Sequence, residues 1–177
     1  MQKLPAIIAV TSDIMLEKIA LRHSQALFEQ IVRHRDYLAQ FVNWTPFTQK
    51  IEDAVNFVKA SEQDAEQGIS YVWAICYRNN PVGTLSLNKP IDWQNRTVYL
   101  GYWLSPDVQG KGIVTQSIQR VMEEIHPIFD HYFLKCAVHN QRSNAVAKRC
   151  CFQLVERVEN AEKIGDTWYA QNLYRKG

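Results

Sequence analysis

The sequence lacks the features that would place it in several large classes of protein. Its longest apolar runs, such as Tyr71 to Tyr77, are far shorter than the ~20 residues of a transmembrane helix. Pro5 interrupts the apolar stretch Leu4 to Val10, and no A-x-A cleavage site follows it, so a secretory signal is not expected. Lys and Arg total 20 against 18 acidic residues, and this net charge of +2 argues neither for nor against an anionic partner. The sequence contains no basic stripe with interleaved aromatic residues, the pattern that would indicate nucleic-acid binding.

Metal-binding and redox patterns are also missing. The four cysteines, Cys76, Cys136, Cys150 and Cys151, form no C-x-x-C pair, and the histidines show no metal-ligand spacing with Asp or Glu. We therefore assign no metal and expect reduced thiols in a cytoplasmic protein. The 177 residues contain no repeat or long linker, so they predict a single domain.

The first half of the chain predicts helices followed by an antiparallel meander. A short strand over 14–21 precedes an amphipathic helix from about His23 to Gln40. A second helix around Ala54–Val58 ends by Gly68. Aromatic and β-branched residues then predict three strands, with a turn at Asn79-Asn80-Pro81 after the first. These strands are Tyr71–Tyr77, Val82–Leu87 and Thr97–Leu104.

The second half predicts a crossover unit. A helix over Ile113–Ile125 ends at Pro127, and a strand follows over Tyr132–Val138. This strand, helix, strand order gives a parallel pair. The remaining elements are a helix capped by Asn140 that ends at Cys150, and a strand pair, Leu154–Val158 and Thr167–Tyr174. The fold class is α+β: a mixed, mostly antiparallel sheet with one parallel pair and helices on both faces.

A glycine-bearing turn between Leu104 and Ile113 carries the strongest chemical signal. Gly110 and Gly112 allow the backbone to approach an anion closely, and the unpaired amides of a helix N-terminus attract it. Lys111 adds a local positive charge, so the turn predicts a phosphate cradle. The spacing matches neither the Walker pattern nor the dinucleotide G-x-G-x-x-G. A purely structural turn stays open as the alternative.

At this point the sequence resembles a known family. Gln109-Gly110-Lys111-Gly112-Ile113-Val114 resembles the Q/R-x-x-G-x-G/A loop of GNAT-fold N-acetyltransferases, and Leu100–Leu104 resembles the family's fourth strand. The segment from Asn140 to Phe152 resembles its N-x-x-S/A segment. The G-Y-W-L, Q-G-K-G-I and N-x-x-S-N elements are most similar to the RimL-type ribosomal-protein serine acetyltransferases. The resemblance implies one GNAT domain over residues 1–177, in which the parallel strand pair splays.

The resemblance also implies a reaction and a cofactor. Acetyl would pass from acetyl-CoA to a primary amine by direct attack in a ternary complex. The implied acceptor is a protein N-terminal α-amine of the ribosomal-protein type. A small-molecule amine (polyamine, amino acid or antibiotic) and a non-catalytic acyl-CoA-binding module are the alternatives, and a homodimer is compatible with either. The implied cofactor-binding residues are Tyr102, Trp103, Leu104, Gln109, Gly110, Lys111, Gly112, Ile113, Val114, Thr115, Asn140 and Ser143.

Backbone groups carry much of this implied binding. Those of Trp103 and Leu104 would bind the pantetheine arm as an added strand and donate to the developing oxyanion. Gly101, a glycine inside a strand, indicates a bulge or a close approach.

The resemblance also points to candidate catalytic side chains. Ser143 lies where RimL-type enzymes place a hydroxyl, so it is the candidate acid, with helix capping as the alternative. Ala147 replaces the tyrosine acid of many relatives. Tyr99 stands where many relatives have Glu; it could relay a proton through water or simply pack at the surface of a strand. His139 could serve as the base or be a solvated histidine at the end of a strand. Cys151 replaces the usual glycine, and a different helix-cap geometry is expected there.

Overall fold

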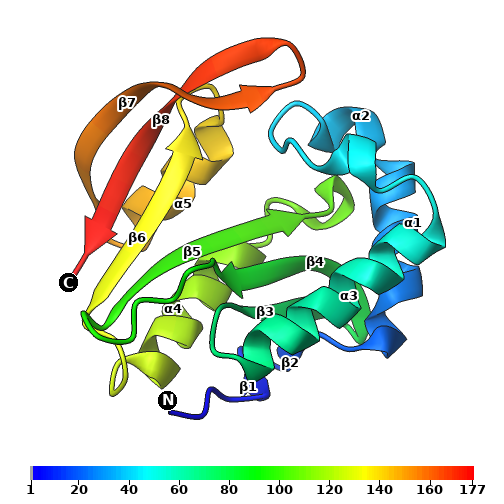
Figure 1. The fold of residues 1–177 in the computed structure, drawn as a ribbon, viewed down its shortest axis with the longest axis horizontal. Coiled ribbons are helices and arrows are strands. Elements are labelled where there is room, and N and C mark those ends of the chain that lie inside the picture. The colour runs from blue at the N-terminus through cyan, green and yellow to red at the C-terminus, as the bar shows by residue number, and fades with distance from the viewer. Residues whose placement is uncertain (1) are drawn as a thin grey trace.

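Residues 2–177 of the computed structural model form one eight-stranded sheet with the strand order β1-β2-β3-β4-β5-β6-β8-β7 (Figure 1). All neighbouring strands are antiparallel except β5 and β6. The strands are β1 (Ile7–Ala9), β2 (Ile14–Lys18), β3 (Tyr71–Tyr77), β4 (Asn80–Leu87), β5 (Thr97–Leu104), β6 (His131–Ala137), β7 (Gln153–Ile164) and β8 (Thr167–Lys176). The α-helices are α1 (Ser24–Arg33), α2 (Arg35–Leu38), α3 (Ile51–Glu66), α4 (Ile113–Ile125) and α5 (Gln141–Arg149).

Helices cover both faces of the sheet. α1 and α3 pack together over β3 and β4 on the face that we call the front, and α4 and α5 pack on the back (Figure 1). Because successive strand residues point to opposite faces, β3 feeds two cores. Val72 joins the small core under α1 and α3, and Trp73 lies in the large core under α4. None of the helices in residues 2–177 has both the length and the apolar character of a membrane crossing.

Several predicted elements match closely, and others are corrected. β3, β5 and α4 have the predicted bounds. The single helix predicted from His23 is wrong, because its backbone breaks at His34 (φ −119°, ψ 26°) between α1 and α2. The turn after β3 is also shifted. Arg78 and Asn79, both at positive φ, make the turn, and Pro81 lies within β4 beside a bulge.

The end of α5 overturns the expectation of a different cap at Cys151. Cys151 has φ +62°, the left-handed conformation that glycine usually supplies. Its N–H bonds to the oxygen of Lys148, and the N–H of Phe152 bonds to the oxygen of Ala147, both at 3.0 Å. This is a Schellman cap, so the cysteine keeps the geometry and bears the strain of positive φ.

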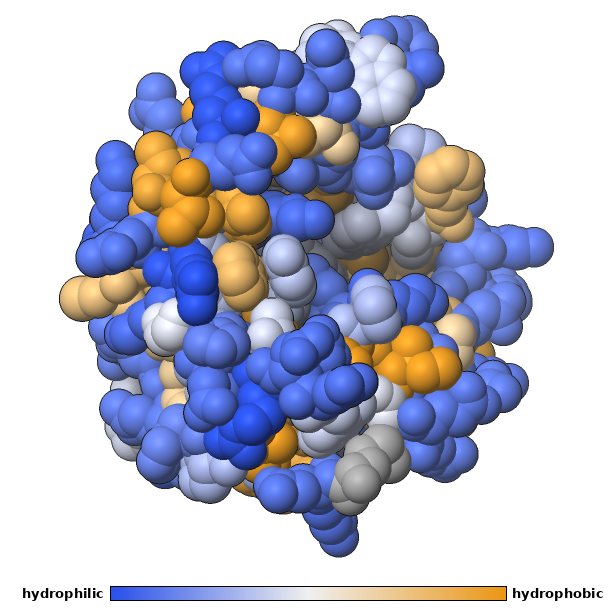
Figure 2. All heavy atoms as spheres, turned by 60° about the vertical axis from the view of Figure 1, so that its left-hand side comes forward, coloured by the Kyte–Doolittle hydropathy of each residue, from blue (hydrophilic) through white to orange (hydrophobic). Residues whose placement is uncertain are grey.

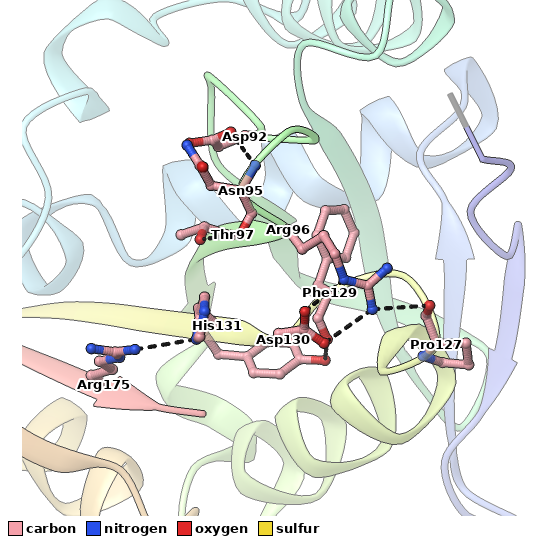
Figure 3. A network of polar contacts seen from close by, with 10 residues as sticks. Asp92, Asn95, Arg96, Thr97, Pro127, Phe129, Asp130, His131 and Arg175 are labelled. Carbon is pink, nitrogen blue, oxygen red and sulfur yellow. Dashed lines mark hydrogen bonds and ion pairs between the residues drawn. The ribbon is translucent and has the colours of Figure 1, made fainter.

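The parallel pair opens along its length. β5 and β6 pair from Thr97 with His131 as far as Leu100 with Leu134, although both strands continue. Their closed end is held by Arg96, whose guanidinium forms two bonds of 2.6 and 3.0 Å to the Asp130 carboxylate (Figure 3). The strands therefore diverge toward their carboxyl ends, as the predicted splayed pair requires.

Candidate functional site

A cleft of about 1230 Å³ lies where β5 and β6 separate. Tyr99 and all but one of the predicted cofactor-binding residues line it. The exception is Lys111, which is exposed and lies outside the lining. The predicted positive charge at the glycine turn is therefore not part of the cleft wall.

The glycine turn presents an uncapped helix N-terminus to the cleft. Gly110 (φ +78°) and Gly112 (φ +71°) are both left-handed, and Gly112 is the N-cap of α4, which has no side-chain cap. The N–H of Gln116 bonds to the oxygen of Gly112 at 3.0 Å, so the amides of residues 113–115 precede this helical bond. Such amides, with the helix dipole, suit a phosphate group.

Helices α1 and α2 hold the loop that precedes this N-terminus. The Asp107 carboxylate lies 2.9 Å from His34 and 3.3 Å from Arg33. Contact with His34, and then with Arg33, lowers the pKa of Asp107 below its usual value. The side-chain amide of Gln109 donates a hydrogen bond of 2.8 Å to the hydroxyl of Tyr37. The cradle is therefore fixed from the helical side of the domain.

The outer half of β5 has an unpaired edge. The N–H of Ser105 bonds to a carbonyl of β4 at 2.8 Å, and the carbonyl of Tyr99 accepts a 2.7 Å bond from the residue after β4. Because these directions alternate along an antiparallel strand, the backbone groups of Trp103 also face β4. Those of Tyr102 and Leu104 face the gap. The predicted backbone contact by Trp103 is therefore corrected, and Tyr102 takes its place beside Leu104.

A half-buried hydroxyl pair occupies the back of the cleft. The Tyr102 hydroxyl and Ser143 Oγ are 2.5 Å apart. Burial raises the pKa of the Tyr102 phenol well above its usual range, and burial raises the pKa of the nearby Cys136 thiol to about 11. Ser143 also gives its backbone N–H to the Asn140 side chain at 3.2 Å, which makes Asn140 the N-cap of α5. Both predicted roles of Ser143 are thus geometrically compatible.

On the front face of the sheet, β5 and β6 form the floor of the cleft. Tyr99 stacks on Phe133 with ring centroids 4.8 Å apart. Next to it, Gly101 leaves a space that the Asn88 amide fills, since a Cβ on Gly101 would lie 2.8 Å from that amide. The β4–β5 register is regular here, so Gly101 marks a close approach rather than a bulge.

Two carboxylates line the cleft, and sequence reasoning missed both. Asp92 accepts bonds from the backbone and side chain of Asn95 at 2.9 and 2.8 Å, which lower its pKa. Glu162, near the end of β7, accepts a 2.7 Å bond from the Gln171 side chain. Only the folding of the β7–β8 hairpin brings Glu162 to the cleft, so no local motif could have indicated it.

His139 is not a solvated histidine at the end of a strand. Its Nε2 lies 2.8 Å from the oxygen of Gln40, and its ring stacks between Phe41 (5.5 Å) and Tyr169 (4.1 Å). These contacts join the segment after α2 to β8. His139 therefore holds two walls of the site together.

A second group of potential ligands lies outside the cleft. Glu17, His23 and Cys76 bring their donor atoms within 4.8 Å of one another. His23 accepts the N–H of Ala20 at Nδ1 (3.0 Å) and contacts Glu17 through Nε2 (2.8 Å). Both ring nitrogens are thus engaged in protein hydrogen bonds, so we assign no metal there.

Comparison with known proteins gives a consistent result. A family model described as an acetyltransferase (GNAT) domain matches residues 13–153. The ribosomal-protein-serine acetyltransferase of Escherichia coli (strain K12) is 30% identical over 171 residues, which cover 96% of this chain and 95% of that protein.

Solved structures agree over nearly the whole chain. The microcin C7 self-immunity acetyltransferase MccE, in complex with acetyl-CoA and AMP, superposes with a TM-score of 0.93 at 34% identity and covers 97% of this chain and 96% of its own. The ribosomal L7/L12 α-N-protein acetyltransferase RimL, in complex with coenzyme A, gives 0.92 at 30% identity and covers 96% and 97%.

Proposed function

Because this chain belongs to the GNAT acetyltransferase family, we propose that its cleft binds acetyl-CoA and serves acetyl transfer to the α-amine of a protein N-terminus. The observation that carries the proposal is the gap between β5 and β6, which ends at the uncapped N-terminus of α4. The acceptor class follows the name of the E. coli relative, a ribosomal-protein-serine acetyltransferase.

The residues present fit the coenzyme. The amides of residues 113–115, exposed by Gly110 and Gly112, would hold the pyrophosphate. The unpaired backbone edge at Tyr102 and Leu104 would bind the amide-bearing pantetheine arm as an added strand. Bound there, acetyl-CoA supplies an activated acetyl thioester. Lys111 lies between the two cradle glycines but outside the cleft lining.

Proton transfer is assigned to groups on opposite faces of the sheet. An amine attacks only when neutral, so a base must hold its proton, and we assign Glu162 on the front. A departing thiolate needs a donor, and we assign Ser143 on the back, where it bonds to Tyr102. Tyr99, the earlier candidate for proton relay, is instead proposed to floor the acceptor site through its stacking on Phe133.

The direct test is thiol release from acetyl-CoA with a panel of amines, together with mass spectrometry of the products. Peptides with a free N-terminus should be acetylated at the α-amine. Gly112→Val should abolish coenzyme binding, because it places a branched side chain at the left-handed cap of the cradle. Gly165→Val is the matched control, since Gly165 is also left-handed (φ +60°) but lies in the β7–β8 turn outside the cleft. Equal coenzyme affinity in both variants would remove the cradle from the proposal.

A second acceptor class has one specific observation in its favour. The MccE structure, at 34% identity, is a complex with both acetyl-CoA and AMP. A small-molecule amine, such as one joined to a nucleotide, is therefore the alternative acceptor. Turnover with small amines but with no peptide would select it. Tight coenzyme binding without turnover on any amine would select a non-catalytic binding module.

We further propose a cytoplasmic enzyme that forms a homodimer. The four cysteines are free thiols, as a reducing compartment maintains them. The β7–β8 hairpin forms one end of the sheet, and large apolar side chains are exposed on it; Figure 2 shows apolar patches on this side of the molecule. These side chains are Leu154, Val155, Val158 and Trp168. Light scattering tests the oligomeric state.

A further inference from the structure

The front faces of β5, β6 and β8 carry a row of stacked aromatic and cationic side chains. Tyr99 and Phe133 stack nearly in parallel, with an interplanar angle of 15°. Lys135 Nζ lies 5.0 Å from the centre of the Tyr99 ring, and Arg175 Cζ lies 5.8 Å from that of Phe133. His131 Nδ1 lies 3.2 Å from Arg175 Nη2 (Figure 3). We call these five residues the basic ladder, and all of them line the cleft.

Among residues 2–177, no side-chain carboxylate forms an ion pair with the basic groups of the ladder. Arg175 gives its Nε hydrogen to an oxygen of Gly177, the last residue of the sequence, at 2.9 Å, and its Nη2 contacts His131. The two carboxylates of the cleft, Asp92 and Glu162, are bonded to amide side chains instead. An aromatic ring orients a cation without neutralising it, so the ladder presents two exposed, ordered charges.

The charges are spaced for an extended chain. Phe133 pairs with Tyr99 on one side and with Arg175 on the other. Lys135 lies two residues further toward the open end, level with Gly101, and His131 lies two residues toward the closed end. Strand residues rise about 3.3 Å each, so the three basic side chains are spaced about 7 Å apart along the sheet. Alternate side chains of an extended peptide have the same spacing.

The ladder is also separate from the coenzyme cradle. It begins level with Gly101 and continues toward the closed end that Arg96 and Asp130 hold together. The cradle lies at the opposite, open end, where β5 leads into α4. The phosphates of the coenzyme are therefore assigned to the open end, and the ladder is left to a second anion.

We propose that the basic ladder binds an acidic acceptor: an extended peptide whose carboxylate side chains occupy alternate positions just after the reacting amine. This rests on the proposed function, because it takes the amine to enter from the front of the sheet. Lys135 would meet the first carboxylate and Arg175 the second. Charge complementarity favours this occupant over a neutral or basic peptide.

The test uses three six-residue peptides that begin with serine and carry Glu, Gln or Lys at their third and fifth positions. Their affinity for the coenzyme A-loaded protein is measured by calorimetry, and kcat/KM is measured with acetyl-CoA. We expect the Glu peptide to bind about tenfold more tightly than the Gln peptide at low salt, with the difference shrinking at high salt. The double variant Lys135→Glu/Arg175→Glu should reverse the order and favour the Lys peptide.

Lys59→Glu is the control, because Lys59 is exposed on α3 and lies outside the cleft. It changes net charge but should keep the wild-type order of peptides. Equal binding of the three peptides by wild type would overturn the inference, whether or not any of them is acetylated. So would a loss of acetyl-CoA or AMP affinity in the double variant with an unchanged peptide order, since the ladder would then bind phosphate. Absence of acetylation with the binding order intact would count against the proposed function alone.

Discussion

The hydroxyl pair of Ser143 and Tyr102 gives the sharpest test of the catalytic assignment. Ser143→Ala removes one hydroxyl of a pair that is 2.5 Å apart, and Tyr102→Phe removes the other. The helix cap survives the first change, because Asn140 bonds to the backbone N–H of Ser143, which alanine retains. The serine side chain can therefore be deleted without removing the N-cap of α5.

The expected magnitudes differ for stability and for rate. Ser143→Ala leaves the half-buried Tyr102 hydroxyl without this partner, which costs at most about 3 kcal/mol. For a domain of this size that lowers Tm by about 2–4 °C per kcal/mol. Deleting both hydroxyls leaves neither unpaired, so the double variant should be less destabilised than the sum of the two single changes. Loss of the acid should lower kcat about 10- to 1000-fold.

The assay is a double-mutant cycle read out three ways: thermal unfolding, coenzyme A affinity and kcat. Ser143→Ala should lower kcat more than it lowers affinity, and Tyr102→Phe should lower kcat while Ser143 Oγ remains in place. Replacement of Cys136 by Ser is the control, since it alters another polar neighbour of the pair. An unchanged kcat in Ser143→Ala would refute the acid assignment and leave Ser143 only its place in the cap.

Three further outcomes follow from the same structure. Gly83→Ala places a Cβ against the carbonyl oxygen of Trp103, so it should destabilise the fold by about 1–3 kcal/mol in chemical denaturation; a neutral effect would mean that β4 shifts freely. With a thiol reagent at pH 8, the exposed Cys151 should react rapidly. The three buried cysteines should react slowly, because burial raises the pKa of each thiol to about 11. Rapid reaction of all four thiols in the native protein would contradict this prediction. Asp107→Asn should lower Tm at neutral pH. Because the pKa of Asp107 is depressed in the folded state, the difference in Tm from wild type should vanish as the pH falls through that pKa, below about 4. A difference in Tm that does not depend on pH would exclude an ionic contribution of Asp107.

Local patterns were enough to predict the central elements of the fold. β3, β5 and α4 were predicted with their observed bounds, because each carries an uninterrupted strand or helix period between clear turn signals. The helix predicted from His23 failed at His34, where no proline or glycine announces the break. There the tertiary contact between His34 and Asp107 accompanies a non-helical backbone. Cys151 shows the same limit, since packing holds a cysteine in a glycine conformation.

The glycine turn of the proposed cofactor site could be predicted from the sequence, whereas the proposed catalytic groups could not be paired from it. The loop is one continuous segment, so neighbouring residues in the sequence are enough to indicate an anion-binding turn. Tyr102 and Ser143 are 41 residues apart in sequence, and Glu162 reaches the cleft only through the β7–β8 hairpin. The register between β5 and β4 decides which backbone groups of β5 face the gap. In the observed register these are the groups of Tyr102 and not those of Trp103, which had been expected there. Register is a property of two strands, so one strand's sequence does not contain it.

The alternation of side chains along β5 explains how one strand could serve both halves of the proposed reaction. Tyr102 points to the back, where it meets Ser143, whereas Tyr99 lies on the front, where it stacks on Phe133. A donor for the leaving thiolate and a base for the incoming amine would therefore be kept on opposite sides of the strand. Without that separation the two groups could exchange a proton directly and neutralise each other's role. A shift of β5 by one residue would exchange the two faces, so we expect a one-residue insertion between Gly101 and Tyr102 to abolish turnover even if the coenzyme still binds.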